Sequence, residues 1–290
     1  MKKKIYLGIV LILIISLTGC FKRDNYEGIK IYTTSYPVEY LVSELYGYNS
    51  EVVSIYPTGV DYQKYELTNK QTTEYSKASI FVYNGLSEEK AIARNFINEN
   101  NNLKIIDVSY GLSIAYGMEE LWLAPNNYLM LATTLKNNLN ELIINKYIKE
   151  EIVNNFANIE EKLSILDAEL RTIGSSARSN GTENIVVGTD TFLFLNDYGF
   201  KVTSIQNKDN ITDEVKTSFK SSKIKYILID SRQKVSAEIN DLVANNGAIL
   251  IKVDTMLVLT DQQINEKVNY LTIMKDFLDN IKKITLAPEK

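Results

Sequence analysis

Short apolar runs alternate with helix-like segments along the first part of the chain. The apolar runs are rich in β-branched and aromatic residues, which favours strands, and they lie at 29–34, 51–56, 79–83 and 103–107. Residues 36–45 carry apolar side chains on one helical face, and Pro37 suits the first turn of a helix. A further helix is expected at 68–76. Strands that alternate with helices predict parallel sheets built from βαβ units.

The same plan returns in the last third of the chain. The pattern predicts strands at 184–187, 201–205, 225–230 and 248–253. It predicts helices at 191–198, 212–221, 235–245 and 268–283. The chain therefore contains two lobes of the same α/β kind.

A long apolar stripe separates the two lobes. After a helix expected at 126–146, apolar residues recur at alternating steps of four and three, which is typical of one helical face, at Ile152, Phe156, Ile159, Leu163, Leu166, Leu170 and Ile173. The stripe predicts one helix from about Lys149 to Gly174, where Gly174-Ser-Ser is expected to end it. The fold class is thus α/β: two βα lobes with mainly parallel sheets, joined by one long helix. Such a helix is expected to limit closure of the lobes.

The first twenty residues are typical of a targeting signal. Three lysines precede an apolar run from Ile5 to Leu17, which is too short for a comfortable membrane span. Leu17-Thr18-Gly19-Cys20 resembles the lipobox of bacterial lipoproteins, and Cys20 is the only cysteine. The resemblance implies cleavage before Cys20 and its acylation, which anchors the protein on the outer face of the cytoplasmic membrane. The alternative is a buried cysteine in an ordinary N-terminal anchor.

These boundaries divide the chain into five segments. We expect a lipoprotein signal peptide at 1–19, a tether at 20–28, an N-terminal lobe at 29–147, the connecting helix at 148–181 and a C-terminal lobe at 182–290.

Composition excludes several classes of function. The chain has 32 basic and 36 acidic residues, and loss of residues 1–19 removes three lysines and no acid, which leaves a net charge of −7. Such a charge does not suit nucleic acid. There is no histidine and no cysteine besides Cys20, so a serine–histidine or cysteine nucleophile is excluded. No phosphate-binding loop is present, and we expect no enzymatic activity.

Four phrases resemble the solute-binding lipoproteins of ATP-driven zinc and manganese importers, the group known as cluster A-I. They are Thr33–Pro37 (TTSYP), Pro57–Glu66 (PTGVDYQKYE), Lys77–Leu86 (KASIFVYNGL) and Leu121–Pro125 (LWLAP). The likeness extends over residues 29–283 and weakens in the second lobe. It implies the family's two-lobed fold, an ion site between the lobes, a monomer, and a membrane permease and ATPase as partners.

The resemblance also implies where the ion ligands come from. The family's first two ligands are usually histidines, and this chain has Gln63 and Glu120 at those positions. The third, in the loop after the first strand of the second lobe, corresponds to Asp190, with Thr189 beside it. The fourth, after the last strand, corresponds to Asp254. An amide oxygen and three carboxylates form an all-oxygen ligand set, which suits manganese, whereas zinc sites usually contain nitrogen ligands. Zinc also binds such oxygens.

Other interpretations of these residues remain open. Gln63 and Glu120 are also typical surface residues, and Asp190 and Asp254 are typical caps of a helix or turn. In that case the chain is a degenerate receptor that serves as an adhesin or interaction protein. A third possibility is a cleft for an organic solute, with Trp122 in its floor and tyrosines at its border, namely Tyr56, Tyr62, Tyr65, Tyr110 and Tyr116.

Overall fold

The computed structural model describes residues 26–62 and 64–285. The predicted signal peptide, Cys20 and Gln63 lie outside the described residues. The first sheet is fully parallel with the order β2-β1-β3-β4. Its strands are β1 (Ile29–Thr33), β2 (Ser50–Ser54), β3 (Ile80–Tyr83) and β4 (Lys104–Asp107).

The second sheet repeats this arrangement. It is also parallel, with the order β6-β5-β7-β8. Its strands are β5 (Asn184–Val187), β6 (Lys201–Ser204), β7 (Tyr226–Asp230) and β8 (Ile249–Val253). The predicted α/β class with two parallel-sheet lobes is confirmed.

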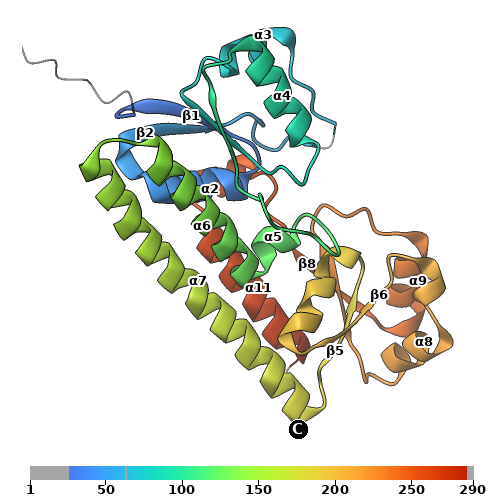
Figure 1. Ribbon diagram of the computed structural model, residues 1–290. Helices are drawn as coiled ribbons and strands as arrows, with labels where there is room; N and C mark the ends of the chain where they lie inside the picture. Colours follow the sequence, from blue (N-terminus) through green and yellow to red (C-terminus); the bar gives the residue numbers. More distant parts are fainter. Residues whose placement is uncertain (1–25, 63, 286–290) are drawn as a thin grey trace, which may run out of the picture.

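Helices cover both sheets and fill the space between them (Figure 1). The first lobe carries α2 (Tyr36–Tyr46), α3 (Asn69–Tyr75), α4 (Glu89–Glu99), α5 (Glu120–Leu123) and α6 (Pro125–Leu142). The second lobe carries the 3-10 segment η2 (Asp190–Tyr198) and the helices α8 (Asp213–Lys220), α9 (Ala237–Asn246), α10 (Asp261–Asn265) and α11 (Tyr270–Thr285). Two short 3-10 turns, η1 (Gly47–Asn49) and η3 (Lys208–Asn210), complete the described elements.

The predicted connecting helix is a single helix, α7 (Lys146–Asn180). It runs along one side of both lobes, next to α6 and α11 (Figure 1). The seven stripe residues are all buried, as their spacing predicts. The predicted end at Gly174 is wrong, because the helix continues to Gly181, whose φ of 69° closes it in the left-handed conformation.

Gly174 has a packing role instead. A Cβ built at Gly174 would lie 1.9 Å from the backbone oxygen of Tyr198. The absent side chain therefore lets α7 approach the backbone at the end of η2. Local sequence signals cannot distinguish a glycine needed for such an approach from one that ends a helix.

Some elements differ from their predicted form. Residues 191–198 form a 3-10 segment rather than an α-helix. The helix α4 was not predicted, and of its residues only Glu89, Ala93 and Phe96 are buried. Glu120 begins the short helix α5, for which no helix was predicted. Among the described residues, no helix has both the length and the apolar character that a membrane crossing requires.

Hydrogen bonds join the two lobes directly. The backbone N–H of Tyr36 donates to Leu257 O at 3.0 Å, and that of Gly59 donates to Leu259 O at 3.0 Å. The indole Nε1 of the fully buried Trp122 donates to Thr255 O at 2.8 Å, and the Tyr270 hydroxyl donates to Trp122 O at 2.7 Å. The segment after β8 is thus bound to loops of the first lobe, which restrains lobe closure in addition to α7.

Candidate functional site

Both sheets direct the carboxyl ends of their strands toward the boundary between the lobes. In each sheet the second strand of the lobe pairs with one edge of the first strand, and the third strand pairs with its opposite edge. Ligands of open parallel sheets bind at such switch points, outside the carboxyl ends of the strands. The loops after β1 and β3 in the first lobe and after β5 and β7 in the second lobe are therefore the expected site.

A cleft of about 830 Å³ lies at this place and is lined by residues of both lobes. Its polar side chains include three carboxylates, two amides and one guanidinium, which belong to Asp61, Glu119, Asp230, Gln206, Gln233 and Arg232. Clefts of this size accommodate small organic ligands as well as hydrated ions.

Arg232 is fixed at the wall formed by the second lobe. Its Nη2 donates to the Thr255 hydroxyl, which itself donates to Asp230 Oδ2 at 2.8 Å. The guanidinium Nε lies 3.7 Å from Asp230 Oδ1. Thr255 is fully buried, so this hydrogen-bond network holds the Arg232 guanidinium in a fixed position. The charge of Arg232 is offset mainly by Asp230, which leaves Glu119 and Asp61 as the other acidic groups of the cleft.

The structure describes three of the four positions predicted as ion ligands. Gln63 lies outside the described residues, and none of Glu120, Asp190 and Asp254 is among the residues that line the cleft. Within residues 26–62 and 64–285, no group of three or more acidic or cysteine side chains lies close enough together to hold a metal ion.

Glu120 uses its carboxylate inside the first lobe. The side chain is 4% exposed, and its two oxygens accept the backbone N–H groups of Ala115 at 2.7 Å and Tyr116 at 2.9 Å. Its neighbour Glu119 lines the cleft, and Glu119 Oε2 accepts a 3.3 Å hydrogen bond from the Thr191 hydroxyl of the other lobe. Of these two adjacent carboxylates, Glu119 is the one that a solute in the cleft meets.

Neither Asp254 nor Asp190 lines the cleft, and both stand at turns of the second lobe. Asp254 Oδ1 accepts the backbone N–H of Met256 at 2.7 Å, and Oδ2 accepts from Gln263 Nε2, so Asp254 caps the turn after β8. Asp190 begins η2 between Thr189 and Thr191, both of which line the cleft. The Thr189 hydroxyl and the Asp190 backbone N–H both donate to Gln206 Oε1, each at 2.9 Å.

The predicted border of tyrosines divides into two parts. Tyr62 and Tyr116 line the cleft, whereas Tyr56, Tyr62 and Tyr65 line a neighbouring pocket of the first lobe. Tyr110 is 80% exposed and lines neither cavity. Trp122 is fully buried beneath the cleft, with its indole N–H bonded to Thr255.

Sequence reasoning missed Glu119, Asp230 and Arg232. Asp230 offered a usable signal, because it is the last residue of the strand predicted at 225–230, and ligand-binding residues gather at the carboxyl ends of parallel strands. Arg232 offered none, since a charged residue in a polar loop is typical of a surface.

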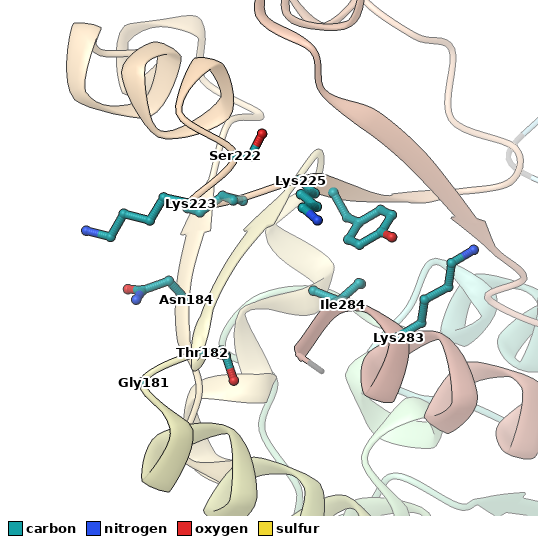
Figure 2. A pocket seen from close by; sticks show the side chains of 10 residues that line it. Gly181, Thr182, Asn184, Ser222, Lys223, Lys225, Lys283 and Ile284 are labelled. Carbon is teal, nitrogen blue, oxygen red and sulfur yellow. The ribbon is translucent and has the colours of Figure 1, made fainter. Parts of the chain in front are cut away.

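A smaller cavity at the far end of the second lobe is a weaker candidate for the binding site than the cleft. It measures about 240 Å³ and is bordered by Lys223, Lys225 and Lys283. Figure 2 shows that Lys223 and Lys283 extend to opposite sides of it. The Lys283 ammonium lies 5.8 Å from the centre of the Tyr226 ring. The lysine charges therefore do not converge on one position.

The sequence matches a family model along most of its length. The model describes the periplasmic component A of a zinc-uptake complex and matches residues 31–284. The chain belongs to this family. Its members are solute receptors of uptake systems and not enzymes, and they act outside the cytoplasm together with a permease and an ATPase. No curated protein matches the sequence significantly.

Solved structures of similar fold agree with this assignment. The metal-dependent lipoprotein YcdH from Bacillus subtilis is 21% identical with a TM-score of 0.75, over 89% of this chain and 100% of that one. The Zn(II)-bound ZnuA-like domain of Streptococcus pneumoniae AdcA is 23% identical with a TM-score of 0.73, over 89% and 99%. The periplasmic zinc-binding protein TroA from Treponema pallidum is 18% identical with a TM-score of 0.68, over 90% and 100%. At these identities the likeness establishes the fold.

Proposed function

We propose that this protein captures a divalent metal ion, zinc or manganese, in the cleft between its lobes and delivers it to the permease of an ATP-driven importer. Family membership supports the role of receptor, and the zinc named for TroA and for the AdcA domain supports a divalent metal ion as the cargo. The observation that carries the proposal is the cleft itself, which presents oxygen-bearing side chains from both lobes at the carboxyl ends of both sheets.

The proposed ligands are oxygens, because the chain has no histidine. We propose Gln63, Asp190 and Asp254 as ligands from their resemblance to the family; the Asp190 and Asp254 side chains do not line the cleft and would have to turn toward the ion. For the remaining position we propose Glu119 in place of Glu120. Glu120 would have to release two backbone N–H groups to bind an ion, and an unpaired buried donor costs about 1–3 kcal/mol. Within residues 26–62 and 64–285, Glu119 has to give up only its 3.3 Å bond with Thr191.

Uptake by cells tests the role of receptor. Cells that lack this gene are expected to accumulate less labelled zinc or manganese from metal-poor medium, and expression of the protein should restore uptake. Unchanged uptake of both metals in the deletion strain would contradict the role.

An organic solute is the second candidate cargo. Arg232 is a fixed cation inside the cleft, and a neighbouring cation repels a bare metal ion. The same guanidinium suits a carboxylate-bearing solute, which it binds through two parallel hydrogen bonds. The third candidate function is that of a receptor that has lost transport and acts in adhesion. This function predicts that no ligand binds with high affinity.

We further propose that acylated Cys20 holds the protein on the outer face of the cytoplasmic membrane, as a monomer. Cys20→Ala is expected to release the protein from membranes or to leave it unprocessed, because acylation provides the hydrophobic anchor. Labelled palmitate and detergent phase partition measure this. Label that still enters the Cys20→Ala variant would contradict the assignment.

A further inference from the structure

A second cavity lies in the first lobe, next to the cleft. It measures about 820 Å³ and is lined by residues from the loops after β2 and β3 and from α4. Tyr62 and Met118 line both this cavity and the cleft, so the two spaces adjoin. We call this cavity the tyrosine pocket, after Tyr56, Tyr62 and Tyr65 in its wall.

The three tyrosines form angled aromatic walls. The Tyr56 ring centre lies 6.1 Å from that of Tyr62 and 5.9 Å from that of Tyr65, with interplanar angles of 74° and 79°. Tyr56 thus stands nearly perpendicular to both partners. The Tyr65 hydroxyl accepts a 2.7 Å hydrogen bond from Gln71, which holds that ring in place. Aromatic rings set at such angles form the cages that bind quaternary ammonium groups.

A buried carboxyl group, that of Glu89, belongs to the same pocket. Glu89 begins α4, is 3% exposed and lines the cavity. Its Oε2 accepts the backbone N–H of Asn84 at 3.0 Å. Among the described residues that line the pocket there is no lysine or arginine, so no fixed cation of the pocket wall neutralises this carboxylate.

Burial raises the pKa of Glu89 to about 7, against neighbouring polar groups that lower it, among them the backbone N–H of Asn84. The Asp107 carboxylate adds to the rise. The other titratable groups around Glu89 are Tyr56 and Tyr83, whose own pKa values are raised by burial and by Glu89, and Glu66 and Glu88 in the pocket wall. None of these groups is a cation. A bound cation would therefore favour the ionised carboxylate.

We propose that the tyrosine pocket binds an organic cation whose ammonium head group lies among the three tyrosine rings and pairs with the Glu89 carboxylate. The apolar side chains that complete the wall, Leu67, Leu86, Ile92 and Phe96, suit the hydrocarbon part of such a molecule. This inference does not depend on the metal cargo, because the pocket and the cleft have different linings apart from Tyr62 and Met118.

Calorimetric titration with choline tests the proposal, with 3,3-dimethyl-1-butanol as the uncharged probe of the same shape. Choline is expected to bind and the alcohol to bind at least about tenfold more weakly, since cation–π attraction and ion pairing both need the charge. Choline affinity is expected to fall on the order of tenfold from pH 8 to pH 6, because the carboxyl group takes up a proton over that range.

Variants separate this site from simple structural burial of Glu89. Glu89→Gln keeps the size of the side chain and an oxygen that accepts from Asn84, so it should fold, as far-ultraviolet circular dichroism can verify. It is expected to lose both the affinity for choline and its pH dependence, and Tyr65→Ala is expected to lose affinity alone. Glu99→Gln, on the exposed end of α4, is the matched control and should bind as the natural chain does. Choline that gives no heat, or that binds equally at both pH values and equally to Glu89→Gln, would overturn the proposal.

Discussion

Replacement of Gly174 with alanine is expected to destabilise the protein by about 2–3 kcal/mol, which corresponds to a fall in Tm of roughly 5–10 °C. The added methyl group would lie 1.9 Å from the backbone oxygen of Tyr198. That backbone cannot move away easily, because the Tyr198 hydroxyl donates to Asp167 Oδ1 on α7 at 2.8 Å and its ring packs edge-on against Phe194. Thermal and denaturant unfolding measure the effect.

The expected change in stability has the opposite sign to that of most glycine-to-alanine substitutions in helices. In an ordinary helix interior, glycine to alanine stabilises by about 1 kcal/mol, the opposite of what the close approach predicts. Ser176→Ala, at an exposed position of the same helix, is the control and should leave Tm unchanged or slightly higher. If Gly174→Ala behaved like Ser176→Ala, the packing of α7 against the second lobe would have to be described differently.

The adjacent residues Glu119 and Glu120 are expected to respond in opposite ways to the same isosteric change. Glu119→Gln should weaken binding of zinc or manganese at least about tenfold, because affinity at an oxygen site depends on the number of carboxylates that converge. It should hardly alter Tm, since the Glu119 side chain makes a single, long hydrogen bond among the described residues, to Thr191. Competition titration with a chelating dye measures the affinity.

Glu120→Gln is expected to keep metal affinity and to lose stability. Its amide NH₂ group would face one of the two backbone N–H groups that Glu120 now accepts, those of Ala115 and Tyr116. An unpaired buried donor costs about 1–3 kcal/mol, which unfolding measurements detect. The reverse pattern, with affinity lost in Glu120→Gln and kept in Glu119→Gln, would contradict this proposal. It would identify Glu120 as the ligand, as the family resemblance indicates.

The positions changed in these two pairs of variants also show which features of the fold local sequence patterns predict and which they do not. Periodicity predicts the eight strands and the single long helix, because both depend on local alternation of apolar residues. The sequence does not predict the role of Gly174, because that role depends on the backbone of Tyr198, which is distant in sequence. The helix α4 escaped prediction because its buried positions include a carboxylate, Glu89, where an apolar residue is the usual signal.

The site was predictable to the level of its loops and no further. The loops that carry Glu119, Asp190 and Asp254 do reach the boundary between the lobes. Which of two adjacent glutamates turns toward the cleft depends on whether the other one satisfies nearby backbone donors, a tertiary property that spacing does not record. The same holds for Arg232, whose position in the cleft is set by Asp230 and by the buried Thr255.

The central claim is that this histidine-free receptor still captures a metal ion. Elemental analysis of the purified protein, followed by calorimetric titration of the metal-stripped form with manganese and with zinc at neutral pH, tests it most directly. We expect about one divalent ion per chain, and we expect the affinity to fall as pH is lowered, because protons compete for the carboxylate oxygens. A protein that purifies without metal and gives no heat with either ion would contradict the claim.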